Sequence, residues 1–274
     1  MSTVFDLKNV CFDYPGKLPA LRDVSFAVGR SERIAIVGAN GSGKSTLLHL
    51  LDGLYFASSG TVIALGQALT EDVVESPDFG PVFRKEVGFV FQNSDAQLFC
   101  PTVWEELAFG PLQIESLSRD DISRRIEDTL ALLDIARLAD RVPNTLSAGE
   151  KKRVALASVL VVAPSVLLLD EPTAGLDPRS QSALIEILEG LHQGGLTLIL
   201  ATHDLALLPH LADRAIILGE EHRIVADRPV NDLLADTDLL LRVNLIHEHT
   251  HRHGATAHSH PHSHVPAHEH EHGS

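Results

Sequence analysis

The strongest chemical signal is a glycine-rich segment at residues 38–46, which reads GANGSGKST. Its spacing is that of a phosphate-binding loop (P-loop), in which a tightly folded backbone surrounds phosphate oxygens with N–H groups. Lys44 would reach the β- and γ-phosphates, and the Ser45 hydroxyl would coordinate Mg²⁺. A helix beginning at Lys44 would add its positive N-terminal end. The predicted nucleotide contacts are Gly38, Ala39, Asn40, Gly41, Ser42, Gly43, Lys44, Ser45 and Thr46.

Two acidic residues end an apolar run at residues 166–171, which reads VLLLDE. Such a run is typical of a strand buried on both faces, and its carboxyl end would bring Asp170 to the metal ion. Glu171, the next residue, is placed to polarise and deprotonate an attacking water molecule. With the phosphate loop, this pair predicts Mg²⁺-dependent hydrolysis of a nucleoside triphosphate.

A third segment, at residues 146–157, reads LSAGEKKRVALA. Ser147 and Glu150, three residues apart, form the pattern of a capping box at the start of a helix. The same helix start, with Gly149 inside it, also fits a second anion-binding site. The residues alone leave both interpretations open.

The segment LSAGE resembles the LSGGQ signature of ATP-binding-cassette (ABC) ATPases, with Ala148 and Glu150 as departures. The resemblance implies that the signature of one subunit closes over the ATP held by the P-loop of another. It thereby assigns Ser147, Gly149 and Glu150 to the nucleotide site. The departures keep a small residue and a polar group, so ATPase activity is still expected.

Four further positions match ABC motifs in the family's order, and the resemblance covers residues 1 to about 235. Tyr14 matches the aromatic residue that stacks on adenine. Gln92, in FVFQNSD, matches the glutamine that links Mg²⁺ and the attacking water to the transporter interface. Asp177, in AGLD, matches the loop that crosses the dimer. His203, in ILATHD, matches the switch histidine that contacts the γ-phosphate, so Gln92 and His203 join the predicted catalytic set.

Buried strands and amphipathic helices must position these motifs. The first 30 residues read as strands with partial period-2 alternation, and short apolar runs alternate with helical patterns afterwards. This order predicts an α/β fold: a P-loop NTPase of the ABC type with an antiparallel, β-rich N-terminal part and an inserted helical subdomain. The predicted segments are strands within 32–39, 166–170 and 196–202, helices at 118–134 and 177–192, and a helical subdomain at about 92–163.

The composition narrows the class of protein further. A formal net charge of −15 argues against nucleic-acid binding, which requires a basic surface. The two cysteines, Cys11 and Cys100, are far apart and suit a reducing interior. The N-terminus has no secretion signal, and Pro164 interrupts the longest apolar stretch, at 155–169, which is too short to span a bilayer. We therefore expect another polypeptide to supply the channel.

Residues 92–111, QNSDAQLFCPTVWEELAFGP, resemble the segment that follows the glutamine loop in ATPase subunits of energy-coupling-factor (ECF) importers. The pattern predicts a loop and then a short amphipathic helix, Thr102 to Phe109, with Val103, Leu107 and Trp104 on its apolar face. An ordinary core helix would show the same pattern. The ECF resemblance implies instead a docking groove for the coupling helix of a membrane partner.

The ECF resemblance also implies the assembly. The partners would be an ECF-type transmembrane subunit and a substrate-capture membrane subunit. In the cobalt and nickel branch of the ECF group one ATPase gene usually supplies both nucleotide sites, so two copies of this chain would form a homodimer, attached peripherally to the cytoplasmic face of the cell membrane. ECF importers bring vitamins or transition metals into prokaryotic cells.

After Asn244 the composition changes to His, Pro, Ser, Glu and Gly, so we divide the chain into an ATP-binding domain at 1–244 and a tail at 245–274 that is predicted to be disordered. Alternating His-x-His suits Ni²⁺, Co²⁺ or Zn²⁺. A purification tag or a polar spacer would also account for a histidine-rich end. The predicted metal ligands are His247, His249, His251, His253, His258, His260, His262, His264, His268, His270 and His272.

An ECF-like ATPase with a histidine-rich tail resembles the cobalt and nickel branch of that group, and import of one of these metals is the predicted function. The ATPase of a zinc transporter, or of an importer for another ECF substrate, is a close alternative. A P-loop metallochaperone GTPase would need an Asn-Lys-x-Asp motif, which the sequence lacks. Soluble ABC ATPases of DNA repair or translation would need a long coiled-coil insertion or a second cassette.

Overall fold

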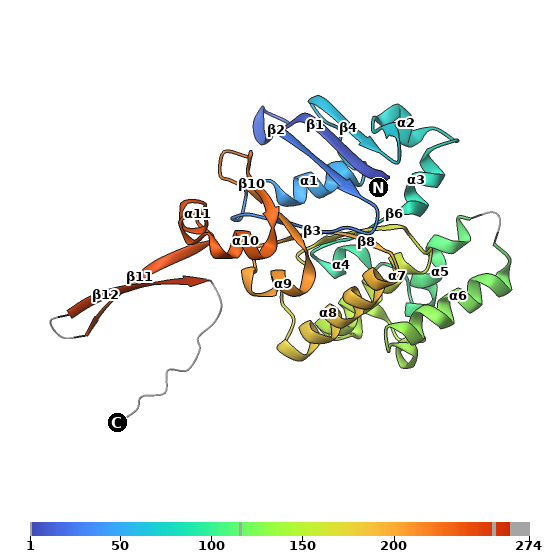
Figure 1. The fold of residues 1–274 in the computed structure, drawn as a ribbon. Coiled ribbons are helices and arrows are strands. Elements are labelled where there is room, and N and C mark those ends of the chain that lie inside the picture. The colour runs from blue at the N-terminus through green and yellow to red at the C-terminus, as the bar shows by residue number, and fades with distance from the viewer. Residues whose placement is uncertain (1, 115–116, 254–255, 264–274) are drawn as a thin grey trace.

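The computed structural model describes residues 2–114, 117–253 and 256–263, with side chains described as far as Ile246. A six-stranded sheet forms its centre, in the order β10-β9-β3-β8-β7-β6 (Figure 1). Five of these strands run parallel, and β10 pairs antiparallel at the edge. The strands are β3 (Arg33–Val37), β6 (Val87–Val90), β7 (Val166–Asp170), β8 (Thr197–Thr202), β9 (Arg214–Leu218) and β10 (Ile224–Pro229).

The N-terminal part forms a second, antiparallel sheet in the order β2-β1-β4-β5. Its leucine, valine and phenylalanine side chains share one core with α1 (Lys44–Leu51), which lies between the two sheets (Figure 1). The strands are β1 (Thr3–Tyr14), β2 (Leu18–Gly29), β4 (Ser59–Ala64) and β5 (Gln67–Ala68). The antiparallel, β-rich N-terminal part predicted from the sequence is confirmed.

The central strands are apolar throughout because each of their faces belongs to a different core. In β3, Ile34 and Ile36 pack with the antiparallel sheet, whereas Ala35 and Val37 pack with the helices on the other side. Both faces are therefore covered, which removes the polar alternation expected of a half-exposed strand. The carboxyl ends of β3, β7 and β8 meet at one edge of the sheet, since the three strands are parallel neighbours.

Between β6 and β7 the described residues form helices and no strand, as the predicted helical insertion requires. Ser147 accepts a hydrogen bond from a backbone N–H group at the start of α7, as its predicted capping box requires, and Ser118 caps α6 in the same way. Thr102 caps α5 in the same way. The helices are α4 (Ser94–Gln97), α5 (Val103–Leu112), α6 (Arg119–Leu132), η1 (Ala136–Leu138), η2 (Pro143–Thr145) and α7 (Ala148–Leu160).

The remaining helices cover the sheet and its ends. The long helix α8 lies with α7 and α9 on the face opposite α1 (Figure 1). The helices are α2 (Glu71–Glu75), α3 (Gly80–Glu86), α8 (Pro178–Gln193), η3 (Leu205–Leu207), α9 (Leu208–Leu211), α10 (Val230–Ala235) and α11 (Thr237–Arg242).

The C-terminal region differs from the expectation in two ways. Leu245 and Ile246 are buried in the main core, so the packed domain continues two residues beyond the predicted boundary at Asn244. The backbone then forms an antiparallel pair, β11 (Ile246–His253) and β12 (Thr256–Ser263), where we predicted disorder. Extended strands accommodate a strictly alternating sequence, because a strand has a side-chain period of two. Residues 264–274 lie outside the described residues.

Candidate active site

The P-loop follows β3 and leads directly into α1. Gly43 precedes the helix with a φ of 109°, and a Cβ atom there would lie 2.3 Å from the Ala20 carbonyl oxygen. A Cβ atom on Gly38 would lie 2.5 Å from the Leu218 carbonyl oxygen. Only glycine avoids both contacts and tolerates the left-handed backbone at 43. The loop therefore needs these two glycines to fold closely over the end of the sheet.

Lys44 is buried in this loop. Its Nζ donates to the carbonyl oxygens of Gly38 at 2.9 Å and Ala39 at 3.2 Å. Burial lowers the pKa of Lys44, and the carboxylates of Glu171 and Asp170 oppose that shift. The buried hydroxyl of Ser42 has no hydrogen-bond partner among the described residues. A buried cation and an unsatisfied hydroxyl are the groups that a phosphate ligand would complement.

A cavity of about 400 Å³ opens on this loop, and residues from five separate segments of the chain line it. Tyr14 lines it, and its hydroxyl lies 2.9 Å from the Thr46 hydroxyl oxygen. Gln92 enters from the loop after β6, and Glu171 from the end of β7. The lining residues are Tyr14, Pro19, Ala20, Asn40, Gly41, Gly43, Lys44, Ser45, Thr46, Gln92, Glu171 and His222.

The two predicted carboxylates are both buried at the end of β7. Asp170 is 5% exposed, and its Oδ1 has no hydrogen-bond partner among the described residues. Burial raises the pKa of the Asp170 carboxyl, and the Ser45 hydroxyl opposes the shift. An unpartnered carboxylate oxygen beside a hydroxyl is a donor set that Mg²⁺ prefers. The residues present therefore fit the metal expected from the sequence.

Glu171 is held from two sides. His203 Nδ1 lies 2.8 Å from its Oε1, and the Thr202 hydroxyl donates to Oε2 at 3.4 Å. The Glu171 backbone has a φ of 45°, which is rare for a residue with a Cβ atom and is characteristic of functional sites. His203 itself does not line the cavity; it reaches the site through Glu171. Carboxylate and imidazole thus form one hydrogen-bonded pair at the edge of the P-loop cavity.

The predicted signature residues lie elsewhere in the chain. Ser147 and Glu150 form the capping box of α7, and the Glu150 carboxylate also accepts from Arg137 Nη2 at 2.8 Å. Asp177 caps α8 through the backbone N–H of Ser180. In the described chain Ser147, Gly149, Glu150 and Asp177 do not line the cavity. A single chain therefore brings the P-loop, Gln92 and Glu171 together at this cavity, while the predicted signature residues lie away from it.

The structure adds His222 to the cavity, which the sequence motifs did not indicate. His222 lies in the turn between β9 and β10, and its Nδ1 is 3.2 Å from the Ser42 carbonyl oxygen. The backbone N–H of Arg22 donates to the His222 carbonyl at 2.8 Å, which fixes the turn beside the P-loop. No local pattern marks this residue, because its position depends on contacts between segments far apart in the sequence.

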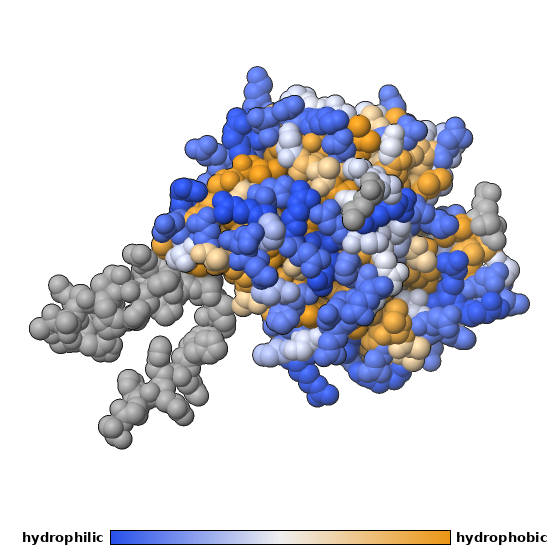
Figure 2. Space-filling view, in the orientation of Figure 1, coloured by the Kyte–Doolittle hydropathy of each residue, from blue (hydrophilic) through white to orange (hydrophobic). Residues whose placement is uncertain are grey.

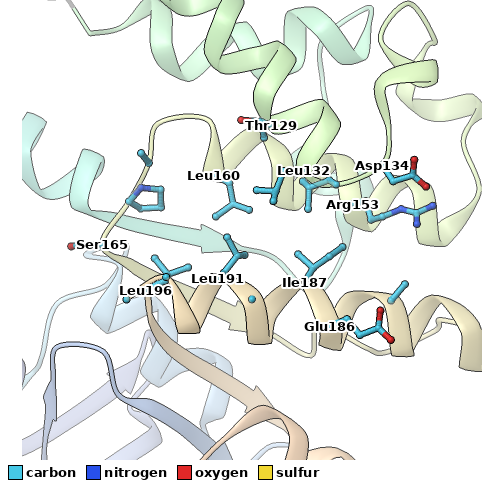
Figure 3. Close-up of a pocket in the computed structure, with 17 residues that line it drawn as sticks. Thr129, Leu132, Asp134, Arg153, Leu160, Ser165, Glu186, Ile187, Leu191 and Leu196 are labelled. Atoms are coloured by element: carbon cyan, nitrogen blue, oxygen red, sulfur yellow. The ribbon is translucent and has the colours of Figure 1, made fainter.

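A larger hollow of about 790 Å³ lies between the helical insertion and α8 (Figure 3). Leu132 and Leu160 face Ile187, Leu191 and Leu196 across it. None of the predicted site residues lines this hollow. We therefore assign the chemistry to the smaller cavity, where polar groups converge on the P-loop.

A P-loop closing on a buried lysine, with a metal-binding carboxylate and a second carboxylate beside it, defines a Mg²⁺-dependent nucleoside triphosphatase. Comparison with known proteins gives the family. Residues 21–174 match the family model of the ABC transporter. The chain belongs to the ABC transporter family and is one of its ATP-hydrolysing chains, which use ATP and Mg²⁺.

Several named relatives of this chain are ATP-binding proteins of ABC transporters. The nickel import ATP-binding protein NikO of Rhodobacter capsulatus is 47% identical over 249 residues, which are 90% of this chain and 97% of that protein. The energy-coupling factor transporter ATP-binding protein EcfA of Methanothermobacter thermautotrophicus is 38% identical, covering 88% of this chain and 76% of that protein. The structure of CbiO1 from Clostridium perfringens, part of the ABC transporter complex cbiONQ, matches with a TM-score of 0.77 and 33% identity over 89% of this chain and 96% of that one. The predicted resemblance to ECF-type ATPases is confirmed.

Among the described residues, no helix combines the length and the apolar composition that a bilayer crossing requires.

Proposed function

We propose that this chain is the ATP-hydrolysing subunit of an ECF-type importer for a divalent transition metal, nickel or cobalt. The observation that supports the proposal is a cavity lined by the P-loop, Gln92 and Glu171 in a chain that is 47% identical, over 90% of its length, to a nickel import ATP-binding protein. The site supports the ATPase, and the relative supports the class of cargo.

The residues divide the chemistry among them. The P-loop and Lys44 would bind the phosphates, and Tyr14 would stack on adenine. Ser45, Asp170 and Gln92 would hold Mg²⁺, which neutralises phosphate charge when bound. Glu171 would accept the proton of the attacking water, and His203 would hold the Glu171 carboxylate in place through the 2.8 Å contact.

A second copy of the chain would complete the site. The start of α7 carries unsatisfied backbone N–H groups, as any helix start does, and Ser147 and Gly149 lie in it. Since these residues do not reach the P-loop of their own chain, they would close over ATP bound to the other copy. The proposed assembly is therefore a homodimer with two equivalent sites, and Asp177 would lie near the crossing between the copies.

One prediction concerns the carboxylate at the signature position. Arg137 Nη2 binds the Glu150 carboxylate at 2.8 Å, and the Ser147 N–H and this guanidinium lower the Glu150 pKa. Arg137→Ala should leave an unpaired anion facing the partner's ATP and weaken the apparent affinity for MgATP on the order of tenfold, about 1.4 kcal/mol. Steady-state ATPase assays at varied MgATP would measure this. In a Glu150→Gln background, Arg137→Ala should have little effect; an equal loss in both backgrounds would contradict the pairing.

The proposed docking surface for the membrane partner is the exposed side of α5. Val103 and Leu107, of the predicted apolar face, are buried in the core, as an ordinary core helix would place them. Beside them, Phe99 is 66% exposed and packs edge-to-face on the half-exposed Phe109, with the ring centroids 5.0 Å apart. Leu112 adds a third exposed apolar side chain. Figure 2 shows apolar surface over the helical part of the chain, at the right of the view. An exposed aromatic pair fits a coupling helix from the transmembrane subunit, which would hold the chain at the cytoplasmic face of the membrane.

The histidine-rich tail is the proposed site for transition-metal binding. The backbone register of the β11–β12 pair sets His247 opposite His262, His249 opposite His260, and His251 opposite His258. The side chains of these histidines, and His264, His268, His270 and His272, lie outside the described residues. Support for metal binding comes from the alternating sequence and from the preference of Ni²⁺, Co²⁺ and Zn²⁺ for imidazole.

Removing the tail after Ile246 should abolish Ni²⁺ binding to the purified chain and leave its ATP hydrolysis unchanged. The cut keeps Leu245 and Ile246, which belong to the core. In the full chain, binding should weaken below about pH 6, since protonated imidazole cannot bind metal. Titration calorimetry at several pH values would measure both effects. Undiminished Ni²⁺ binding by the truncated chain would place the metal site elsewhere.

The experiment that tests the proposed cargo is elemental analysis of cells lacking this chain, carrying it, or carrying Glu171→Gln. The proposal expects the content of nickel or cobalt to fall in the deletion and to stay low with Glu171→Gln. A fall in zinc alone would assign the chain to a zinc transporter. If no metal changes, the proposed cargo is wrong.

A further inference from the structure

Lys152 is a buried lysine of α7 that none of the motifs in the sequence requires. Lys152 is only 4% exposed, and its Nζ donates to the carbonyl oxygens of Phe91 at 3.2 Å and Gln92 at 2.9 Å. Within the described residues it forms no ion pair. Buried charges are normally paired with an opposite charge, so a buried lysine whose hydrogen-bond acceptors are two backbone carbonyls indicates a specific role for this side chain.

The position of Lys152 links the two halves of the proposed nucleotide site. It lies in the second turn of α7, whose start carries Ser147 and Gly149. The carbonyls that it binds belong to the segment that carries the Gln92 side chain into the P-loop cavity. Burial lowers the Lys152 pKa, and the carboxylates of Asp170 and Glu171 oppose the shift, so its ammonium group also lies within the field of the acidic pair.

Two further contacts hold the same segment to α7. Gln97 accepts from the Phe91 N–H at 3.1 Å through Oε1, and its Nε2 donates to the Ala155 carbonyl at 2.8 Å. Lys151 pairs with Asp95 at 2.6 Å on the outside of the helix. Among these contacts, Lys152 is the one that acts on the Gln92 backbone itself.

We propose that Lys152 is a positioning residue for ATP hydrolysis: it fixes the Gln92 backbone to the signature helix of the same chain, so that Gln92 and the partner-facing end of α7 move together. The inference rests on the proposed role of Gln92 in hydrolysis. Without the two hydrogen bonds, the loop at Phe91–Gln92 would keep its aromatic packing but lose its fixed distance from α7. Misplacing a reacting group by about 1 Å can cost up to 10²-fold in rate.

The two hydrogen bonds of Lys152 also bear on the docking of the membrane partner. Segment 91–97 leads directly into the loop and helix that carry Phe99 and Phe109, the proposed contact for the membrane partner. A movement imposed on that surface would therefore reach the start of α7 and the Gln92 side chain together. Lys152 would couple the movement of the docking surface to the movement of the start of α7.

The test compares the steady-state kinetics of the full chain with those of Lys152→Met, which removes the donors and keeps an unbranched side chain. We expect kcat for ATP hydrolysis to fall on the order of 10-fold to 100-fold, with KM for MgATP within about twofold. Lys152→Arg, which keeps the charge and the donors, should recover part of the loss. Lys85→Met, the control, removes an exposed lysine of α3 that forms no ion pair among the described residues and should leave kcat within about twofold.

A merely structural role is distinguished by counting active sites. The stoichiometry of binding a fluorescent ATP analogue should stay unchanged in Lys152→Met, and kcat is expressed per bound nucleotide. A drop in stoichiometry and melting temperature with a normal kcat per site would overturn the proposal. If the methionine variant does not fold, Lys152→Leu carries the same test, because it also removes both hydrogen-bond donors.

The double variant Gln92→Ala/Lys152→Met separates the inference from the proposed function. If Lys152 acts through Gln92, the double variant should be no slower than Gln92→Ala, because the two effects are not additive. Additive losses would overturn the role of Lys152. A normal kcat in Gln92→Ala would instead overturn the proposed role of Gln92, whatever Lys152 does.

Discussion

Glu171→Gln should lower ATP hydrolysis by roughly 10²–10⁴-fold while leaving ATP binding intact. The carboxylate lies on the nucleotide cavity and is fixed by His203 at 2.8 Å, which suits a group that accepts a proton at one defined place. Glutamine has nearly the same shape and cannot take the proton. ATP would make its main contacts with the P-loop, so the affinity for ATP should change little.

Single-turnover hydrolysis and equilibrium ATP binding, measured on the same preparation, would check this expectation. Glu86→Gln is a matched control: Glu86 is hydrogen-bonded to Ser165, at the opposite end of β7 from the cavity. It should hydrolyse ATP at the wild-type rate. Near-normal single-turnover hydrolysis by Glu171→Gln would show that another group takes the proton.

Lys44→Ala should act on binding rather than on the chemical step. We expect ATP affinity to fall at least about 30-fold, or about 2 kcal/mol, because a buried, charge-assisted contact to phosphate is lost. The folded chain should not become less stable, since the buried ammonium group has only two carbonyl acceptors among the described residues and its removal relieves a desolvation cost.

Titration with ATP and a thermal melt would measure the two quantities. The control is Lys8→Ala, which removes an exposed lysine paired with Asp6 on β1. It should change neither affinity nor stability. A Lys44→Ala chain that binds ATP as tightly as the wild type would exclude the P-loop cavity as the nucleotide site. A chain that melts well below the wild type would show that Lys44 is needed for folding.

Much of this site could be predicted from local sequence. GANGSGKST needs only a strand before it and a helix after it, and the apolar run at 166–170 ends at Asp170 because a buried strand has to end at the sheet edge. Parallel pairing then brings the ends of β3 and β7 near each other on either side of β8. At these residues the local sequence pattern and the position in the folded chain agree, so the sequence was sufficient to predict where they lie.

Other features depend on contacts that no local pattern encodes. His222 enters the cavity because the β9–β10 turn packs on the P-loop and on β2. Lys152 looks like an ordinary helix lysine, and its burial follows from the packing of α7 against the loop after β6. The left-handed backbone of Glu171 is likewise a product of tertiary packing, since isolated glutamate avoids that region.

The C-terminal region shows a different limit of prediction from sequence. Composition placed the domain boundary at Asn244, but Leu245 and Ile246 still contribute to the core. Composition describes an average over a segment and does not locate the last buried side chain. The signature residues show a third limit: their sequence fits both a helix cap and an anion site, and in one chain they serve as the cap. The proposed second role, as an anion site, would depend on another copy of the chain.

The central claim, that ATP hydrolysis by this chain drives uptake of a transition metal, is tested most directly by the initial rate of metal uptake. Cells carrying the wild-type chain or Glu171→Gln, at equal abundance, would be given radioactive nickel or cobalt. The account predicts rapid uptake with the wild type and a rate with Glu171→Gln no higher than in cells without the chain. Equal uptake by the wild type and Glu171→Gln would contradict it.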